Sequence, residues 1–425
     1  MTDSSLSTRQ KVERSLARRR ATETRFHALG FMAVLFGLLS VVVLFGDILL
    51  KGSSTFRQTV IVTDIHLDAQ FLGLTPRSKE AHIRRADFEG LIRQQLHAAM
   101  PTMTEDEARE LHRLISIGAA WQLSDWVVEN PQHLNQTIRF ELLADHLVDQ
   151  WFKHDRRKGI SQRLSDVQLS WLHEWADSGQ MYTRFNRLFF THGDSQEPEL
   201  AGVRGAMMGT FLTLMVTLVL SFPIGIATAI YLEQFAPARQ WINLVEININ
   251  NLAAVPSITF GLLGLAIFIN LFGVTRSTPL IGGLVLTLMA LPTIIISARA
   301  AIKSVPLSIQ EAAYGLGASK VQVVFHHVLP LALPGMLTGT ILAMAQALGA
   351  TAPLLLIGMV AFVVDVPNAI SDPSTVLPVQ IFLWADSPER AFIERTSGAI
   401  LVLLGFLISM NTLAVLLRQR IERRR

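Results

Sequence analysis

Six charge-free apolar segments constrain the fold of this 425-residue chain more than any other feature. Each is long enough to cross the hydrocarbon of a bilayer as a helix, which takes about 20 residues. In lipid the backbone must satisfy its own hydrogen bonds, and runs of this length favour helices. With 50% hydrophobic and 17% charged residues, the chain is too apolar for an ordinary soluble protein. The segments are 28–46, 206–232, 247–274, 277–298, 335–364 and 396–417.

Basic residues at both ends of the chain indicate its orientation. Seven of the first 25 residues and five of the last eight are Arg or Lys. Cytoplasmic flanks of membrane helices carry such an excess, so both termini are expected in the cytoplasm. Nucleic-acid binding is the alternative, but clusters beside apolar segments favour the topology signal. The expected parts are a cytoplasmic N-terminus (1–27), a first membrane helix kept as an anchor (28–51), an external insert (52–203), a membrane core (204–418) and a cytoplasmic tail (419–425).

The insert is polar and long enough for a core of its own, which predicts a small α+β domain. Residues 59–67 alternate like a strand, and residues 181–191 could form a second one. Thr104 and Glu107 have the spacing of a capping box at the start of a helix. A second helical stripe is predicted from Phe140, Leu143, Leu147 and Trp151.

No chemistry is expected in the insert. Its five tryptophans are interpreted as core residues, and its histidines, which never reach the HExxH spacing of a zinc helix, as surface or core residues. Because the chain has no cysteine, thiolate chemistry is excluded. We expect no catalytic residue, no metal and no cofactor. The residues are Trp121, Trp126, Trp151, Trp171 and Trp175, with His66, His112, His146, His154 and His173 among the histidines.

A polar interruption at 301–334 separates the fourth and fifth apolar segments. Ser308 and Glu311 have capping-box spacing, and Gly317 suits a left-handed helix end. Ser319 and Gln322 would cap a second short helix. The pattern predicts a helix-turn-helix lying along the cytoplasmic membrane face. An amphipathic loop without a partner is the plainer alternative.

Acidic and basic residues are absent from the interiors of the expected spans. This argues against a self-contained proton- or sodium-coupled transporter, which needs an acidic relay, and favours energy supplied by a cytoplasmic partner. Polar and helix-breaking residues gather there instead, where broken helices could present N–H groups to an anion. Ordinary packing of small residues is the alternative. The candidates for a translocation path are Asn251, Pro256, Ser257, Pro292, Thr293, Gln346, Gly349, Thr351 and Pro353.

The polar interruption resembles the EAA loop of ABC-importer permeases. It holds Glu311-Ala312-Ala313, then Gly317, then Leu329-Pro330, and departs from the pattern at His327, where the family has Ile. Residues 339–355 resemble the fifth-span signature of phosphate permeases. Residues 255–261, 291–292 and 377–382 resemble the PstA type rather than PstC. The resemblance covers 206 to the C-terminus, and the insert resembles that of long-form PstA proteins more weakly.

This resemblance implies an all-α polytopic protein of type I permease architecture, with six transmembrane helices and the α+β insert. It implies a phosphate importer subunit of the bacterial inner membrane that performs no ATP hydrolysis itself. The implied partners are a PstC-like second permease, two PstB-like ATPases, a periplasmic PstS-like phosphate-binding protein and membrane lipid, without nucleic acid. The ATPase-coupling residues would be Ser308, Glu311, Ala312, Ala313, Gly317, Ser319, Leu329 and Pro330.

Two positions depart from the phosphate permeases. Gln346 stands where the family has Arg, and Ala350 where it has Glu, so the chain lacks a pair of opposite charges expected one helical turn apart. Either the partner supplies the cation or the path is altered. An importer of molybdate or sulfate, and a membrane sensor of phosphate that has lost transport, remain alternatives.

Overall fold

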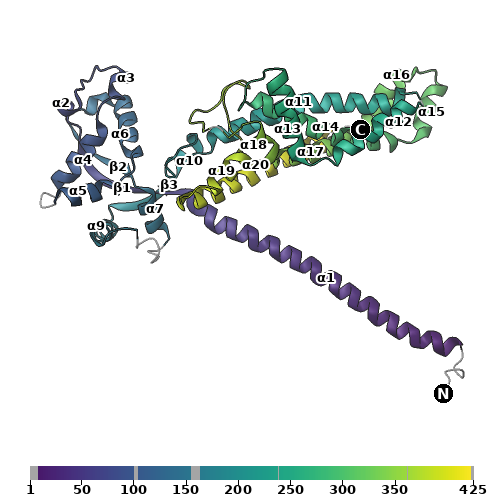
Figure 1. Ribbon diagram of the computed structural model, residues 1–425, viewed down its shortest axis with the longest axis horizontal. Helices are drawn as coiled ribbons and strands as arrows, with labels where there is room; N and C mark the ends of the chain where they lie inside the picture. Colours follow the sequence, from purple (N-terminus) through teal and green to yellow (C-terminus); the bar gives the residue numbers. More distant parts are fainter. Residues whose placement is uncertain (1–7, 100–103, 155–162, 238, 361, 423–425) are drawn as a thin grey trace. The chain divides into compact units, whose positions relative to one another are not determined.

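The computed structural model describes residues 8–99, 104–154, 163–237, 239–360 and 362–422. The chain divides into two units, residues 1–51 and 52–425. From Thr8 onward the first unit belongs to one long helix, α1 (Thr8–Thr55), whose stretch from Arg19 to Thr55 is long and apolar enough to cross a membrane (Figure 1). The basic clusters expected to set the orientation lie partly outside the described residues.

A three-stranded antiparallel sheet organises the insert. The central strand β1 (Arg57–His66) lies between β2 (Thr137–Leu143) and β3 (Met181–Phe185). Val60 pairs with Leu143 on one side and with Tyr182 on the other. The predicted strand at 59–67 is therefore confirmed. Because it is central, its first half is buried on both faces and the alternation fades there.

Short helices surround this sheet and enclose a core that includes Leu91, Leu123, Leu172 and Trp151. They are α2 (Ala69–Leu72), α3 (Glu80–Ile83), α4 (Phe88–Ala99), α5 (Glu105–His112), α6 (Gly118–Glu129), α7 (His146–Lys153), α9 (Asp166–Asp177) and α10 (Arg187–Thr191), with the 3-10 turn η1 (Pro131–His133). The capping box of Thr104 and Glu107 is confirmed at the start of α5.

One prediction for the insert is wrong, and two others hold only in part. The stripe from Phe140 to Trp151 is not one helix: Phe140 lies in β2, and Asp145 starts α7 by accepting a hydrogen bond from the amide of Leu147. The returning strand ends at Phe185, because the Asn186 side chain caps α10. Local capping thus overrode the longer apolar pattern. The tryptophan interpretation also fails at Trp121, which is 61% exposed.

The rest of the second unit is a bundle of long apolar helices (Figure 1). Across the described residues of the chain, five helices can span a membrane by length and composition, or six if one bent pair counts as a span. The elements are α11 (Arg204–Ile230), α12 (Gln240–Ala253), α13 (Ser257–Gly264), α14 (Pro279–Lys303), α15 (Leu307–Gly315), α16 (Lys320–Val323), α17 (Leu329–Leu348), α18 (Ala352–Leu356), α19 (Leu377–Ala385) and α20 (Ala391–Glu422). Three π-helical turns are η2 (Tyr231–Phe235), η3 (Leu265–Leu271) and η4 (Val324–Val328).

The third predicted span is not one straight helix. Helix α12 and the α13–η3 segment meet at an angle of 105°. Pro256 is the N-cap of α13. Its ring removes a donor and disfavours helical geometry at the preceding residue, which accounts for a break at this point.

The fifth predicted span ends earlier than expected. Helix α17 stops at Leu348, and after the five residues of α18 the chain forms no helix until α19 among the residues described there. Gly349 ends α17, and Pro353 lies in the first turn of α18, where its missing N–H has no partner to lose. The prediction of a crossing that continues to residue 364 is wrong. It followed the apolar composition, which continues past these breaks.

Glycines let the helices of the bundle approach closely. A methyl group added to Gly283 of α14 would lie 2.4 Å from Val216 of α11, and one added to Gly335 of α17 would lie 2.7 Å from Ala301 of α14. Small residues at such contacts bring the backbones together. The contact between Gly335 and Ala301 lies near the end of the bundle that carries α15 and α16.

Candidate functional site

The segment between α14 and α17 forms two short helices joined by a tight turn. The expected capping pair of Ser308 and Glu311 is wrong, because α15 begins one residue earlier at Leu307, with Pro306 as an N-cap that makes no side-chain hydrogen bond. The second capping box is confirmed. Ser319 Oγ accepts from the amide of Gln322, and Gln322 Oε1 accepts from the amide of Ser319.

Gly317 ends α15 in the left-handed conformation, with φ of 84°. The amide of Ala318 donates to the carbonyl of Ala313 at 3.1 Å, and the amide of Gly317 donates to the carbonyl of Tyr314 at 2.9 Å. This is the Schellman pattern, which satisfies the last carbonyls of the helix. The predicted left-handed cap is confirmed.

One face of α15 is anchored and the other is free in this chain. Ala313 is 5% exposed and belongs to a cluster with Val323, Val324, Val328, Ile226 and Ile302, among others. Ser308, Glu311 and Ala312 are exposed, as are Gly317 and Ser319. At the turn, Leu316 is 91% exposed. Leu329 and Pro330 are partly buried at the start of α17.

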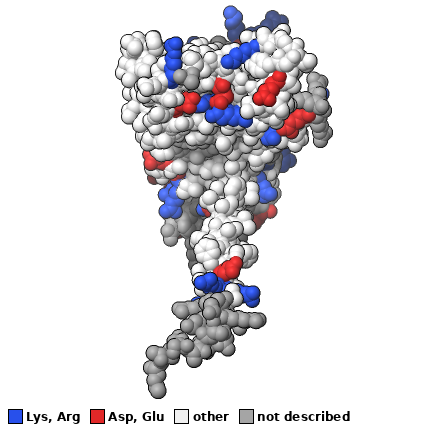
Figure 2. Space-filling view, turned by 90° about the vertical axis from the view of Figure 1, so that its right-hand side faces the viewer, with Lys and Arg blue, Asp and Glu red and all other residues white. Residues whose placement is uncertain are grey.

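The end of the bundle with α15 and α16 faces the viewer in Figure 2, where acidic and basic side chains lie among uncharged ones. Below this surface Arg299 bridges two acids: its Nε lies 3.3 Å from Glu233 and its Nη2 lies 2.7 Å from Glu246. Lys303 adds a contact of 3.6 Å to Glu233. These ion pairs join α14 to η2 and α12. Arg299 lies 53 positions after Glu246 and 66 after Glu233, and no spacing in the sequence indicates that they pair.

The expected path residues fall into an exposed group and a packed group. Asn251, Pro256, Ser257, Gln346 and Gly349 are exposed in this chain, whereas Pro292 and Pro353 are buried and Thr293 and Thr351 are partly buried. A methyl group added to Gly261 of α13 would lie 2.7 Å from the Cα of Pro353, so α13 packs against α18. No side-chain hydrogen bond joins two of the nine within the described residues.

Gln346 and Ala350 do not share one helical face. Gln346 is exposed on α17, whereas Ala350 lies beyond the end of that helix and is 8% exposed. Ala350 packs in an apolar cluster with Met344 and Leu354. Charges placed at the two positions would therefore meet different surroundings.

Buried charges join the insert to the start of α20. Lys153 Nζ on α7 lies 2.6 Å from Asp149 and 3.0 Å from Glu394 on α20. The hydroxyl of Thr55 donates to the carbonyl of Glu394 at 2.6 Å.

In the same part of the insert, burial raises the pKa of Glu199 to about 7. Burial opposes the charged form of His146, but Asp145 and then Glu199 outweigh it and raise the pKa of His146 to about 9.

Comparison with known proteins places the chain in a family. Residues 221–425 match the model described as binding-protein-dependent transport system inner membrane component, and residues 13–162 match a domain of unknown function, DUF3333. The phosphate transport system permease protein PstA 1 of Mycobacterium tuberculosis is 30% identical over 56% of this chain and 78% of its own length. The chain belongs to the PstA-like permeases of ABC importers. The structure has five to six apolar helices and a small sheet, which confirms the predicted fold class. The family confirms the prediction of an ABC-importer permease subunit.

A PstC protein and a chain of a solved transporter are also similar to this chain. The phosphate transport system permease protein PstC of Pasteurella multocida is 30% identical over 58% of this chain and 84% of its own length. A chain of the MetNI methionine ABC transporter in an inward-facing conformation aligns over 52% of this chain and 95% of its own, with 18% identity and a TM-score of 0.41. As a member of the family, the chain is a multi-pass inner-membrane protein that works with other ABC subunits.

Proposed function

We propose that this permease carries phosphate inward, in a heterodimer with a PstC-like subunit. Two cytoplasmic ATPases would drive it, and a periplasmic phosphate-binding protein would deliver the substrate. The PstA and PstC relatives are phosphate transport permeases, and this supports phosphate as the substrate. The chain would have both termini in the cytoplasm and the insert 52–203 in the periplasm, and ATP would be hydrolysed by the partners alone.

The geometry of α15 is the observation that carries the coupling role. A helix fixed to the bundle through Ala313 presents Glu311 beside an apolar tip at Leu316, which is 91% exposed. Leu307 and Tyr314 of the same segment are also exposed, 71% and 43%, and a group of exposed apolar side chains among polar ones is typical of a docking surface. We infer that it enters a cleft of an ATPase, and that closure of the ATPases moves α15, α16 and the helices attached to them.

The translocation path would run along the exposed broken helices. Helix α13 begins at Ser257 without a side-chain cap, so its first N–H groups can face an anion. Asn251 and Gln346 would add amide donors. A phosphate is expensive to desolvate without a cation, and this chain has Gln346 where phosphate permeases have Arg. The PstC-like subunit would therefore supply the guanidinium.

The decisive experiment compares two neighbouring glycines in proteoliposomes holding the complete importer. A methyl group meets nothing within 4 Å at either Gly315 or Gly317, but Gly317 alone of the two has a left-handed φ. Placing Ala in that conformation costs about 1–2 kcal/mol. Gly317→Ala should lower phosphate uptake per ATP hydrolysed, while Gly315→Ala should match wild type. Equal coupling in both variants would refute the role of this turn.

Two further readings of the same assay test the remaining alternatives. If molybdate or sulfate is taken up in preference to phosphate, the substrate assignment is wrong. If wild type hydrolyses ATP with its partners but takes up no anion, a sensor is favoured.

Orientation is tested by labelling cysteines at two exposed positions. Ser170→Cys should react with an impermeant reagent added outside, and Ser319→Cys should react only after permeabilisation. Labelling from one side would refute the topology.

A further inference from the structure

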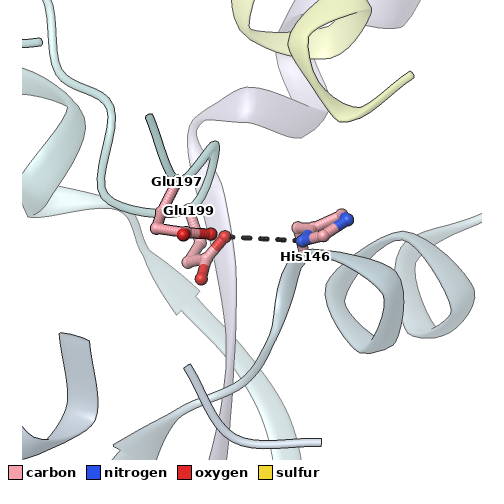
Figure 3. A group of neighbouring side chains, drawn as sticks. All are labelled: His146, Glu197 and Glu199. Carbon is pink, nitrogen blue, oxygen red and sulfur yellow. Dashed lines mark ion pairs between the residues drawn. The ribbon is translucent and has the colours of Figure 1, made fainter. Parts of the chain in front are cut away.

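Three side chains of the insert converge from two segments that are about 50 residues apart in sequence. His146 is the first residue of α7, and Glu197 and Glu199 lie in the segment between α10 and α11 (Figure 3). One ligand atom from each lies within 4.8 Å of the other two. His146 Nδ1 lies 3.8 Å from Glu199 Oε2 and 3.4 Å from Asp145 Oδ2.

Glu199 gives this group its significance. Its side chain is 2% exposed, and while Oε1 accepts a hydrogen bond of 2.6 Å from Ser116, Oε2 has no hydrogen-bond partner. His146 Nδ1, which faces that oxygen, also lacks one. A buried carboxylate oxygen left unpaired is costly, and such an atom commonly marks a missing ion or water.

The charge of the group favours a cation. Three carboxylates, those of Asp145, Glu197 and Glu199, surround one imidazole, so negative charge remains even when the histidine is protonated. In the described part of the chain, no Lys or Arg forms an ion pair with any of these three. Surface acidic clusters are common without ions, but here one member is buried and its free oxygen points at an imidazole nitrogen.

We propose that His146, Glu197 and Glu199 bind a divalent transition-metal ion such as Zn²⁺. One imidazole nitrogen and two carboxylate oxygens make a donor set that zinc accepts, with bonds of about 2.0–2.2 Å. Those bonds place neighbouring ligand atoms roughly 3.3 Å apart, so the pair now at 3.8 Å needs to close by about half an ångström. Asp145 Oδ2 or water would complete the coordination.

The position of the site suggests what the metal does. Helix α7 packs on β1 and also reaches α20 through Lys153, whereas Glu197 and Glu199 precede α11 by a few residues. A bound ion would tie the first turn of α7 to the segment that enters the membrane core. We infer that it fixes the insert to the base of α11, a role separate from transport chemistry.

The test measures zinc on the purified full-length chain in detergent. After incubation with a small excess of Zn²⁺ and removal of free metal, elemental analysis should give one zinc per wild-type chain. Glu197→Gln should weaken binding by at least about tenfold in a competition titration. It is the safest variant, because Glu197 is only partly buried and its carboxylate has no ion pair among the described residues. His146→Gln should act in the same direction, and His66→Gln, at an exposed histidine of the same domain, should bind like wild type.

Two results would overturn the proposal. If wild type retains no zinc, His146 and Glu199 form an ion pair without metal. If Glu197→Gln and His146→Gln retain as much zinc as wild type, the ion binds elsewhere. A second measurement guards against misfolding: zinc should slow hydrogen exchange of the amides around Glu199 in wild type, and should not do so in Glu197→Gln.

Discussion

The insert and the membrane core differ in the contacts that stabilise each of them internally. The insert is built around large side chains, such as Trp151 and Leu172, and meets the core through buried ions at Lys153 and Glu394. In the described core, the ion pairs of Arg299 lie near the C-terminal end of α14, and elsewhere the backbones approach through glycines such as Gly283. Where water is absent on all sides, close backbone contact replaces the burial of large apolar groups as the source of stability.

The largest expected effect tests the ionic side of this contrast. Lys153→Met would remove the ammonium that contacts both Asp149 and Glu394, at a site where the Lys153 side chain is 3% exposed. Glu394 would keep His154, whose Nε2 lies 3.6 Å from its carboxylate. Removing one member of a buried ion pair costs about 3–5 kcal/mol. We expect a correspondingly lower midpoint in thermal unfolding followed by tryptophan fluorescence, whereas the exposed Lys79→Met should change little. Equal midpoints would mean that the junction is hydrated and contributes little.

A second prediction asks whether the core tolerates charge where the family carries it. Ala350→Glu would bury a carboxylate in the cluster with Met344 and Leu354, and should destabilise the core by about 3 kcal/mol. Gln346→Arg is exposed on α17 and should fold normally. The readout is the fraction of each variant that remains monodisperse after heating in detergent. If the double variant recovers the stability lost in Ala350→Glu, the two side chains pair after all, and the end of α17 at Leu348 is not maintained.

The sequence predicted the parts of this fold that depend on local signals. Apolar length identified the helices α11, α14 and α20, and capping spacing identified the starts of α5 and α16. Pro256 and Gly349 were named among the helix-breaking residues, but the predicted spans still ran through them. Apolarity continues past both positions, and only neighbouring helices decide whether a proline bends or ends a span. The stripe from Phe140 to Trp151 failed since a single cap at Asp145 outweighed its periodicity.

The same distinction applies to the candidate sites. The turn at Gly317 was predictable, because a left-handed helix end is encoded within a few residues. The ion pairs of Arg299 and the convergence of His146 with Glu199 were not, because their members are more than 50 residues apart and no spacing rule connects them. Exposed path residues such as Gln346 could be proposed from sequence, but which subunit covers them depends on a partner chain.

The smallest expected effect tests the glycine side of the contrast. A methyl group at Gly209 of α11 would lie 2.0 Å from the carbonyl oxygen of Thr375, next to the hydrogen bond of 2.8 Å that the amide of Leu377 donates to Thr210 Oγ1. Because the added methyl group meets a backbone oxygen rather than a movable side chain, α11 and the start of α19 must move apart. We expect Gly209→Ala to cost about 2 kcal/mol, as overpacking typically does.

Gly405 of α20 provides the matched control, because a methyl group there meets nothing within 4 Å. Gly405→Ala should be neutral or slightly stabilising, since alanine favours the helix by up to about 1 kcal/mol over glycine. Both variants are compared with wild type in thermal unfolding of the detergent-solubilised protein. If Gly209→Ala unfolds at the wild-type temperature, α11 and α19 have room to adjust, and close backbone contact does not hold this part of the core. If it unfolds earlier while Gly405→Ala does not, the loss comes from the contact with Thr375 rather than from glycine replacement in a membrane helix as such.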